Sequence, residues 1–196
     1  MQACIFCSAG LASFRCLQVI SNVRPHKINF RRLVADDATE FCALRLDALR
    51  ESPSSFGSAC EDEELRTQAE WASLLAASEE RVFFGAFSSA DLVASVGIQR
   101  ESGRKERHRA FVRGMYVEPS SRCAGVGRRL LSIAISHATC WVGLEQVTLA
   151  VTSSNLAAVS LYQSEGFAEY GVAPRVLLIE GTYYDESLLV RHLSAA

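Results

Sequence analysis

Hydrophobic residues fall along the chain in short runs rich in β-branched and aromatic side chains, and turn residues bound each run. This pattern is typical of strands in a sheet. In residues 146–152, for example, Val147, Leu149 and Val151 alternate with other residues, which predicts that they share one face. The predicted strands span 28–33, 81–87, 92–98, 109–117, 146–152, 175–180 and 183–192, with hairpin turns at 88–91 and 181–182.

Apolar residues at intervals of three or four predict helices between these strands. Asp37 and Glu40 have the spacing of a capping box with Asp37 as the cap, and this first helix ends by Pro53. A second helix is predicted at 61–77, with acidic residues in its first turn, where they suit the helix dipole. Its predicted buried stripe is Leu65, Ala69, Ala72 and Ala76.

Two further helices are predicted in the second half of the chain. One follows Gly125 and Gly127 and runs to about Cys140, and the other spans 155–166. This order of strands and helices predicts a single domain of the α+β class, built around a mixed sheet.

Residues 1–27 differ in composition from the rest, since they contain no Asp or Glu, and their apolar patch is too short to span a bilayer. We predict a flexible leader at 1–27 and a folded domain at 28–196. The leader's composition is loosely like that of an organelle transit segment. A start codon placed upstream of the true one is an equally good interpretation.

Charge and cysteine content narrow the function classes. The formal net charge of −2 gives no strong electrostatic attraction to nucleic acid or to a membrane, so we predict neither as a partner. A homodimer is compatible with this charge. The seven cysteines are scattered and odd in number, which favours a reducing compartment, and we predict a cytoplasmic protein. Cys4 and Cys7 have a metal-like spacing, but only Cys16 and His26 could join them, so we predict no metal.

The stretch at 115–131 carries the clearest chemical signal. A predicted strand is followed by Pro119, by Gly125 and Gly127, and by an apolar helix. Glycines ahead of a helix let backbone N–H groups surround an anion, and the positive end of the helix dipole adds to the attraction. The alternative is a plain strand-to-helix turn. A dinucleotide fingerprint is excluded because Leu130 stands where its third glycine would be.

Arg122, Gly125 and Gly127 match the pattern Arg/Gln-x-x-Gly-x-Gly/Ala. This pattern resembles the acyl-CoA pyrophosphate loop of the GNAT superfamily of N-acetyltransferases. A second signature of that family, Asn-x-x-Ala-x-x-Leu-Tyr followed by Gly-Phe, is matched at 155–167. The two signatures together are far more specific than either alone. The resemblance implies a mixed, mostly antiparallel twisted sheet with helices on both faces.

The resemblance also implies acetyl-CoA as the cosubstrate and a primary amine as the acceptor, a small molecule or a protein N-terminus. Backbone N–H groups would hold the pyrophosphate, the edge of a kinked fourth strand would pair with the pantetheine arm, and an asparagine would hold that arm from the other side. The residues that would bind acetyl-CoA are Met115, Tyr116, Val117, Arg122, Cys123, Ala124, Gly125, Val126, Gly127, Arg128 and Asn155.

Tyr162, within the second signature, is the predicted catalytic residue, as the proton donor to the departing CoA thiolate. The alternative is a tyrosine that only packs its helix. The predicted strand 109–117 contains no acid, and Glu51, Glu101 and Glu118 are left unassigned as general bases. The Asp185-Glu186 dipeptide is also common in the last strand of that family, and we predict no catalytic role for it. The other function in contention is a non-catalytic acyl-CoA-binding module.

Overall fold

The computed structural model describes residues 28–193, so the predicted leader lies outside the described residues. The strands are β1 (Ile28–Arg32), β2 (Arg81–Ser88), β3 (Asp91–Arg100), β4 (Arg109–Val117), β5 (Gln146–Thr152), β6 (Ala168–Ile179) and β7 (Thr182–His192). The helices are α1 (Ala38–Glu51), α2 (Cys60–Glu64), α3 (Gln68–Leu75), α4 (Val126–Ala138) and α5 (Leu156–Ser164), with 3-10 turns η1 (Ala35–Asp37), η2 (Pro53–Ser55) and η3 (Pro119–Ser121). None of the helices within 28–193 has both the length and the apolar character needed to cross a bilayer.

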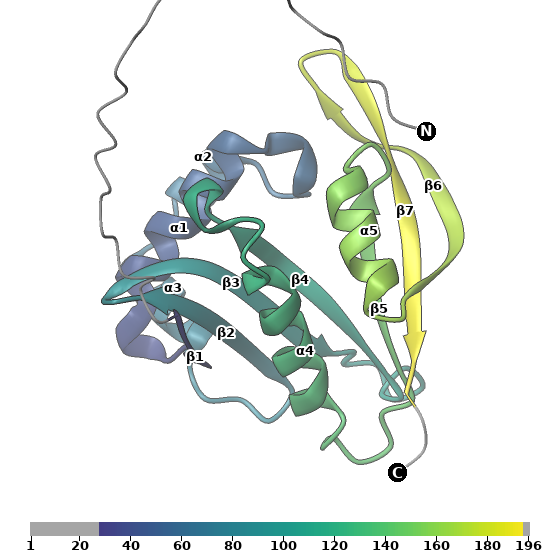
Figure 1. Cartoon of the computed structure of the whole chain (residues 1–196), viewed down its shortest axis with the longest axis horizontal. Helices are drawn as coiled ribbons and strands as arrows, with labels where there is room; N and C mark the ends of the chain where they lie inside the picture. Colours follow the sequence, from purple (N-terminus) through teal and green to yellow (C-terminus); the bar gives the residue numbers. More distant parts are fainter. Residues whose placement is uncertain (1–27, 194–196) are drawn as a thin grey trace, which may run out of the picture.

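The seven strands form one sheet in the order β1-β2-β3-β4-β5-β7-β6. Every pairing is antiparallel except that of β4 with β5. One hydrophobic core lies between the sheet and the helices α4 and α5, and a second lies between the sheet and the helices α1 and α3. Figure 1 shows this arrangement, with α4 crossing β2–β4 on one face and α1 and α3 behind them. The predicted α+β class and mixed, mostly antiparallel sheet are confirmed.

The second predicted helix, 61–77, is wrong in detail, because two short helices occupy its place. Thr67 and Glu70 form a capping box that starts α3: the Thr67 hydroxyl accepts from Glu70 N at 3.3 Å, and Glu70 Oε2 accepts from Thr67 N at 2.7 Å. The buried residues are Trp71 and Leu75. The predicted stripe fails because this new start turns the helix: Leu65, Ala69 and Ala76 are exposed and Ala72 is half-buried.

Strand β6 is longer than the predicted 175–180, since it starts at Ala168. Residues 168–174 are mostly exposed and include Gly171 and Pro174, so they lack the alternation that identifies a half-buried strand. The pairing of β6 with β7 is also interrupted by register shifts at 169–171 and 173–177. The hairpin turn at Gly181 is present as predicted, with φ at +80°.

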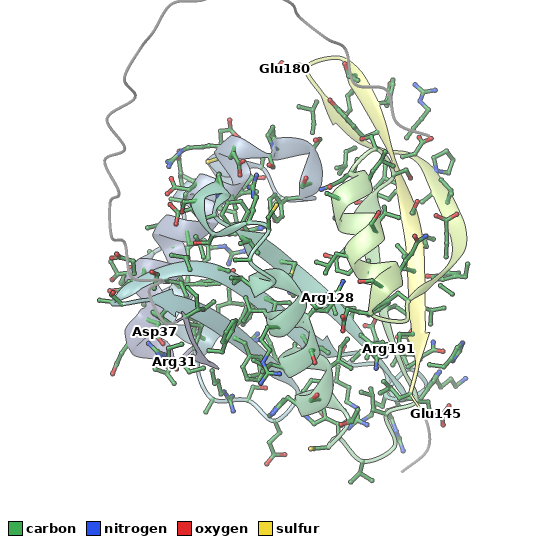
Figure 2. The ribbon with its side chains drawn as sticks, viewed as in Figure 1. Arg31, Asp37, Arg128, Glu145, Glu180 and Arg191 are labelled. Carbon is green, nitrogen blue, oxygen red and sulfur yellow. The ribbon has the colours of Figure 1, made fainter. Side chains whose placement is uncertain are left out.

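Asp37 is the N-cap residue of α1 as predicted, but its side chain makes no capping hydrogen bond, because its carboxylate is bound elsewhere. Arg31 donates from Nη1 to Asp37 Oδ2 at 2.7 Å and from Nη2 to Oδ1 at 2.6 Å, and Val34 N donates to Oδ2 at 2.9 Å. These hydrogen bonds, led by the one from Arg31, hold the pKa of Asp37 below its ordinary value. The pair fastens β1 to the start of α1 (Figure 2).

Replacing Asp37 with asparagine is expected to lower the free energy of unfolding by about 1 kcal/mol at pH 7, because a bidentate, partly buried ion pair is lost. Since the folded pKa is lowered, the stabilisation is present above the unfolded pKa of about 3.9 and disappears as the pH falls through the folded value. Urea unfolding at pH 7 and at low pH measures both effects. Asp36→Asn is the matched control, because Asp36 is exposed. Equal losses in the two variants would contradict the assignment.

Candidate active site

Strands β4 and β5 separate at the centre of the sheet. They pair only from Arg109 to Phe111 on β4 and from Gln146 to Thr148 on β5. Two residues of β4, Gly114 and Met115, stand opposite the single residue Val96 of β3, and Gly114 has φ at +59°. This bulge lies where the sequence predicts a kink. The separation leaves the β5-facing edge of Met115–Val117 without a strand partner among the described residues.

The two glycines of the loop serve different purposes. Gly125 is the N-cap of α4 with φ at +74°, and a Cβ built on it would meet nothing within 4 Å. A Cβ on Gly127 would lie 3.1 Å from Met115 Cε and 3.3 Å from Val117 Cγ2. Gly127 therefore allows α4 to approach β4 closely, while Gly125 supplies a left-handed turn whose outer side is open.

A cavity of about 570 Å³, called here the loop cavity, lies between β4, the glycine loop, α4 and α5. Eleven of the twelve residues predicted to act on acetyl-CoA line it. The exception is Ala124, which is exposed in the loop outside the lining. The lining residues from the prediction are Met115, Tyr116, Val117, Arg122, Cys123, Gly125, Val126, Gly127, Arg128, Asn155 and Tyr162.

The side chain of Arg122 is turned back toward the fold. Its Nε donates to Val117 O at 2.9 Å, and its Nη2 lies 2.5 Å from Glu51 Oε2. The same Glu51 oxygen accepts from the Tyr116 hydroxyl at 2.8 Å. The hydrogen bond from Arg122 is the main cause of a lowered Glu51 pKa. Glu51, left unassigned as a base in the sequence, is thus an ionised clamp joining α1, β4 and the loop.

Arg128 also has a protein partner. Its Nη2 donates to Ser164 Oγ at 3.1 Å, and its Nε lies 3.6 Å from Glu165 Oε1. Figure 2 shows Arg128 on the side of α4 that faces α5. This ion pair offsets the unfavourable position of a cation at the N-terminus of α4. Arg128 therefore ties the two helices together beside the loop cavity.

Tyr162 is almost fully buried on α5, with 7% of its surface exposed. Its ring packs edge-on against Phe167, with 6.0 Å between ring centroids. Within residues 28–193 the hydroxyl has no hydrogen-bond partner, and the residue lines the loop cavity. Burial raises the pKa of Tyr162 to about 12. The phenol consequently keeps its proton throughout the neutral range, so in a proton transfer it can act as an acid and not as a base.

Asn155 is the N-cap of α5 and also holds a neighbouring loop. Its Oδ1 accepts from Ala158 N at 3.1 Å, and its Nδ2 donates to Ser55 Oγ at 3.2 Å. The hydroxyl of Thr152 donates to the carbonyl of Ser54 beside this contact. The turn η2 is thereby fixed across the gap between β4 and β5.

A second cavity, of about 440 Å³, lies on the other side of the gap, among α1, the α2–α3 segment, β4, β5 and β7. We call it the arginine cavity after Arg45, Arg66 and Arg113, which line it together with Glu63 and Glu186. Ser55 and Phe56 line both cavities, so the two cavities adjoin at these residues. No sequence motif identified this cavity, because its residues come from elements far apart in the chain.

Among residues 28–193 no group of His, Cys, Asp or Glu side chains is arranged to hold a metal ion. The pair Cys4 and Cys7 lies outside the described residues. The cysteine of the glycine loop, Cys123, is exposed with φ at +60°, a conformation that contributes to the tight turn before α4.

Two curated proteins resemble parts of the chain. The N-alpha-acetyltransferase RimI of Mycobacterium tuberculosis is 35% identical over 105 residues, which are 54% of this chain and 63% of that protein. A mycothiol acetyltransferase of Thermobispora bispora is 31% identical over 140 residues, which are 69% of this chain and 44% of that protein. The chain thus spans less than two thirds of the length of these relatives.

A solved structure and a family model also resemble this chain. A GNAT-family acetyltransferase from Streptococcus pneumoniae, known from its crystal structure, superposes with a TM-score of 0.77 at 26% identity, covering 85% of this chain and all of that one. The family model described as "Acetyltransferase (GNAT) family" matches residues 45–167, which is more than half of the chain. This chain belongs to the GNAT family of acetyltransferases.

Proposed function

We propose that the protein is an N-acetyltransferase that moves an acetyl group from acetyl-CoA directly to a primary amine. The observation that carries this proposal is the meeting of two cavities at the gap between β4 and β5. The loop cavity would hold acetyl-CoA, the cosubstrate typical of this family, and the amine would enter from the arginine cavity. Ser55 and Phe56, which line both, mark where the acetyl group would meet the amine.

The glycine loop fits a pyrophosphate in two respects. The left-handed turn at Gly125 presents backbone N–H groups at the N-terminus of α4, and the space where its side chain would project is open. The unpaired edge of Met115–Val117 would accept the pantetheine arm in the manner of an added strand. A backbone N–H near the Gly114 bulge would then face the thioester carbonyl and the oxyanion that develops from it.

In the transfer, the amine nitrogen attacks the thioester carbonyl carbon, a C–N bond forms and the C–S bond breaks. The nitrogen loses one proton, which passes to water. The departing thiolate takes the proton of the Tyr162 hydroxyl, and the phenolate regains a proton from that water. Although burial raises the pKa of Tyr162 to about 12, the same dry surroundings raise that of the leaving thiol. The gap between donor and acceptor therefore stays close to the roughly 1.5 units that separate a phenol from a thiol in water.

A panel of amines incubated with acetyl-CoA tests the proposal. Acetylated amine and free CoA, both quantified by mass spectrometry, are expected to appear in equal amounts. A non-catalytic acyl-CoA-binding module would instead bind acetyl-CoA in calorimetry and yield neither product. If acetyl-CoA bound but no peptide, amino acid or simple amine were acetylated, the proposal that the protein is an acetyltransferase would be rejected.

Replacing Glu51 with glutamine is expected to weaken acetyl-CoA binding by about three- to fivefold, because Arg122 loses the carboxylate that fixes it beside the loop. Because the pKa of Glu51 is lowered, Glu51 is ionised throughout the range from pH 6 to 8, and the effect should not vary within it. Calorimetric titration measures the affinity. Glu101→Gln, in a loop outside the loop cavity, is the control. An unchanged dissociation constant in the Glu51 variant would show that the clamp has no part in binding.

A further inference from the structure

The arginine cavity contains more positive charge than its own carboxylates balance. Three guanidinium groups line it against two carboxylates. Glu63 balances one of these three positive charges. Arg66 Nε donates to Glu63 Oε2 at 2.5 Å, and Glu63 Oε1 lies 3.8 Å from Arg45 Nη2. Arg113 is accessible from the cavity and forms no ion pair within residues 28–193; its hydrogen bond goes to the neutral Gln99 at 3.3 Å.

Two buried donors on the wall of this cavity lack acceptors. Arg45 Nη1 and Trp71 Nε1 are both shielded from solvent and have no hydrogen-bond partner in the described part of the chain. Only 2% of the Trp71 surface is exposed, so water does not compensate its indole N–H. A buried donor without a partner destabilises the folded protein. Because these groups only donate, the ligand that suits them carries acceptor oxygens.

The charges of the cavity also act on one another. Burial is the main cause of the lowered pKa of Arg45, and repulsion from Arg113 adds to it. Burial likewise lowers the pKa of Arg113, and Glu63 only partly opposes this. A negatively charged group bound between the two guanidiniums would offset the cost of their desolvation and reduce their mutual repulsion.

A carboxylate on β7 also lines the arginine cavity. Glu186 is half-buried, lines the same cavity, and has no hydrogen bond or ion pair with any described residue. Burial raises the pKa of its carboxyl. An unpaired carboxylate in such a place is complementary to an ammonium group. Glu51, by contrast, is already occupied by Arg122 and Tyr116.

Building on the acetyl transfer proposed above, we propose that the acceptor is a small amino acid or a close analogue, whose acid group binds Arg113 and Arg45 and whose amino group lies at Glu186. The bound ammonium first gives one proton to water and becomes the attacking amine. Glu186 then takes the second proton, which the nitrogen loses as the C–N bond forms, and releases it to water after the transfer. The cavity disfavours a polyamine, whose further cations would meet the arginines. It also disfavours a protein N-terminus, which has no carboxylate close to its amine. A volume of about 440 Å³ suits a small molecule.

Matched acceptors test the class of substrate. The probes are the twenty L-amino acids, their amides, and the corresponding amines that lack the carboxyl group, each with saturating acetyl-CoA. For each amino acid that serves as an acceptor, kcat/KM is expected to exceed the kcat/KM of its amide and of its decarboxylated amine by about tenfold or more. This factor corresponds to the loss of one charge-assisted hydrogen bond. Equal rates for acid and amide, or acetylation of peptide N-termini only, would overturn this inference and leave the acetyltransferase in place.

Two variants test the residues. Arg113→Gln is expected to raise KM for the amino acid by about tenfold while changing kcat, the acetyl-CoA affinity and the rate with the amide by less than about twofold. Glu186→Gln is expected to lower kcat by about tenfold or more with a smaller change in KM. Arg104→Gln, on an exposed arginine outside both cavities, is the matched control. An Arg113 variant that keeps the preference for the acid would refute the arginine assignment.

A binding measurement distinguishes failure of this inference from failure of the proposed function. Melting of the wild-type protein with CoA is recorded in the presence of each amino acid and its amide. An amino acid that raises the melting temperature without being acetylated would support the ligand class and reject the transferase. Acetylation of amines without any stabilisation by, or preference for, the acid form would reject the ligand class alone.

Discussion

Replacing Tyr162 with phenylalanine is expected to lower kcat for acetyl transfer by at least about tenfold, and general acid catalysis accounts for as much as about 10²- to 10⁴-fold. Phenylalanine keeps the ring and its edge-on contact with Phe167, so the variant removes only the hydroxyl. Because the lost interaction belongs to the transition state, acetyl-CoA affinity should change little. Single-turnover measurement with saturating acetyl-CoA gives the rate of the chemical step, independent of product release.

The control for Tyr162 is another tyrosine treated in the same way. Tyr183→Phe alters a half-exposed tyrosine on the β6–β7 hairpin, where Arg175 lies over its ring at 3.7 Å, and it should leave the rate unchanged. The Tyr162 defect should also shrink with an acyl donor whose leaving thiol is more acidic, since that thiolate needs no proton. A Tyr162→Phe single-turnover rate equal to wild type would assign the residue to packing alone.

Most of the residues predicted to act on acetyl-CoA line one cavity, because they come from two short stretches of the chain, 115–128 and 155–162. The turn at Gly125, the close contact at Gly127 and the cap at Asn155 each depend on a particular residue type at a fixed spacing. A backbone that must approach a phosphate restricts the allowed residues locally, and such restriction is visible as a motif. The positions of these residues therefore follow from the pattern, although their roles toward acetyl-CoA stay predictions.

The arginine cavity could not be found in the same way. Arg45 is on α1, Arg113 on β4 and Glu186 on β7, and the three meet only because β4 and β5 separate beyond Phe111. Each of these residues taken alone is consistent with an ordinary solvated charge. The Gly114 bulge shifts by one residue which β4 side chains lie on each face of the sheet. A glycine inside a strand is a signal of a bulge, but it does not identify the distant residues that share a cavity with it.

The errors in the helices have a related origin. Apolar spacing at 61–77 suggested one helix, but the chain restarts at Thr67, where the hydroxyl and Glu70 satisfy each other's backbone N–H groups. Asp37 has the spacing of a cap, yet the two nitrogens of Arg31 bind its carboxylate more strongly. In both places a side-chain contact selected one of two local structures that the sequence permits.

Replacing Gly125 with valine is expected to weaken acetyl-CoA binding by tenfold or more, about 1.4 kcal/mol. A β-branched residue is strained at φ +74°, and its side chain would project into the open space where the pyrophosphate is proposed to lie. The protein itself leaves room for this side chain, so the fold should survive and the loss should fall on the ligand. Isothermal titration with acetyl-CoA measures the change.

Strain and ligand contact can be separated by a second glycine. Gly143, in the turn after α4, has φ at +73° and likewise no atom within 4 Å of a built Cβ, but it lies outside both cavities. Gly143→Val should therefore lower the melting temperature about as much as Gly125→Val, since both place a β-branched residue in the same strained conformation. Only the Gly125 variant should lose affinity for acetyl-CoA. If the two variants lost stability alike and both bound acetyl-CoA as the wild type does, the glycine loop would be a structural turn and the pyrophosphate would have to lie elsewhere.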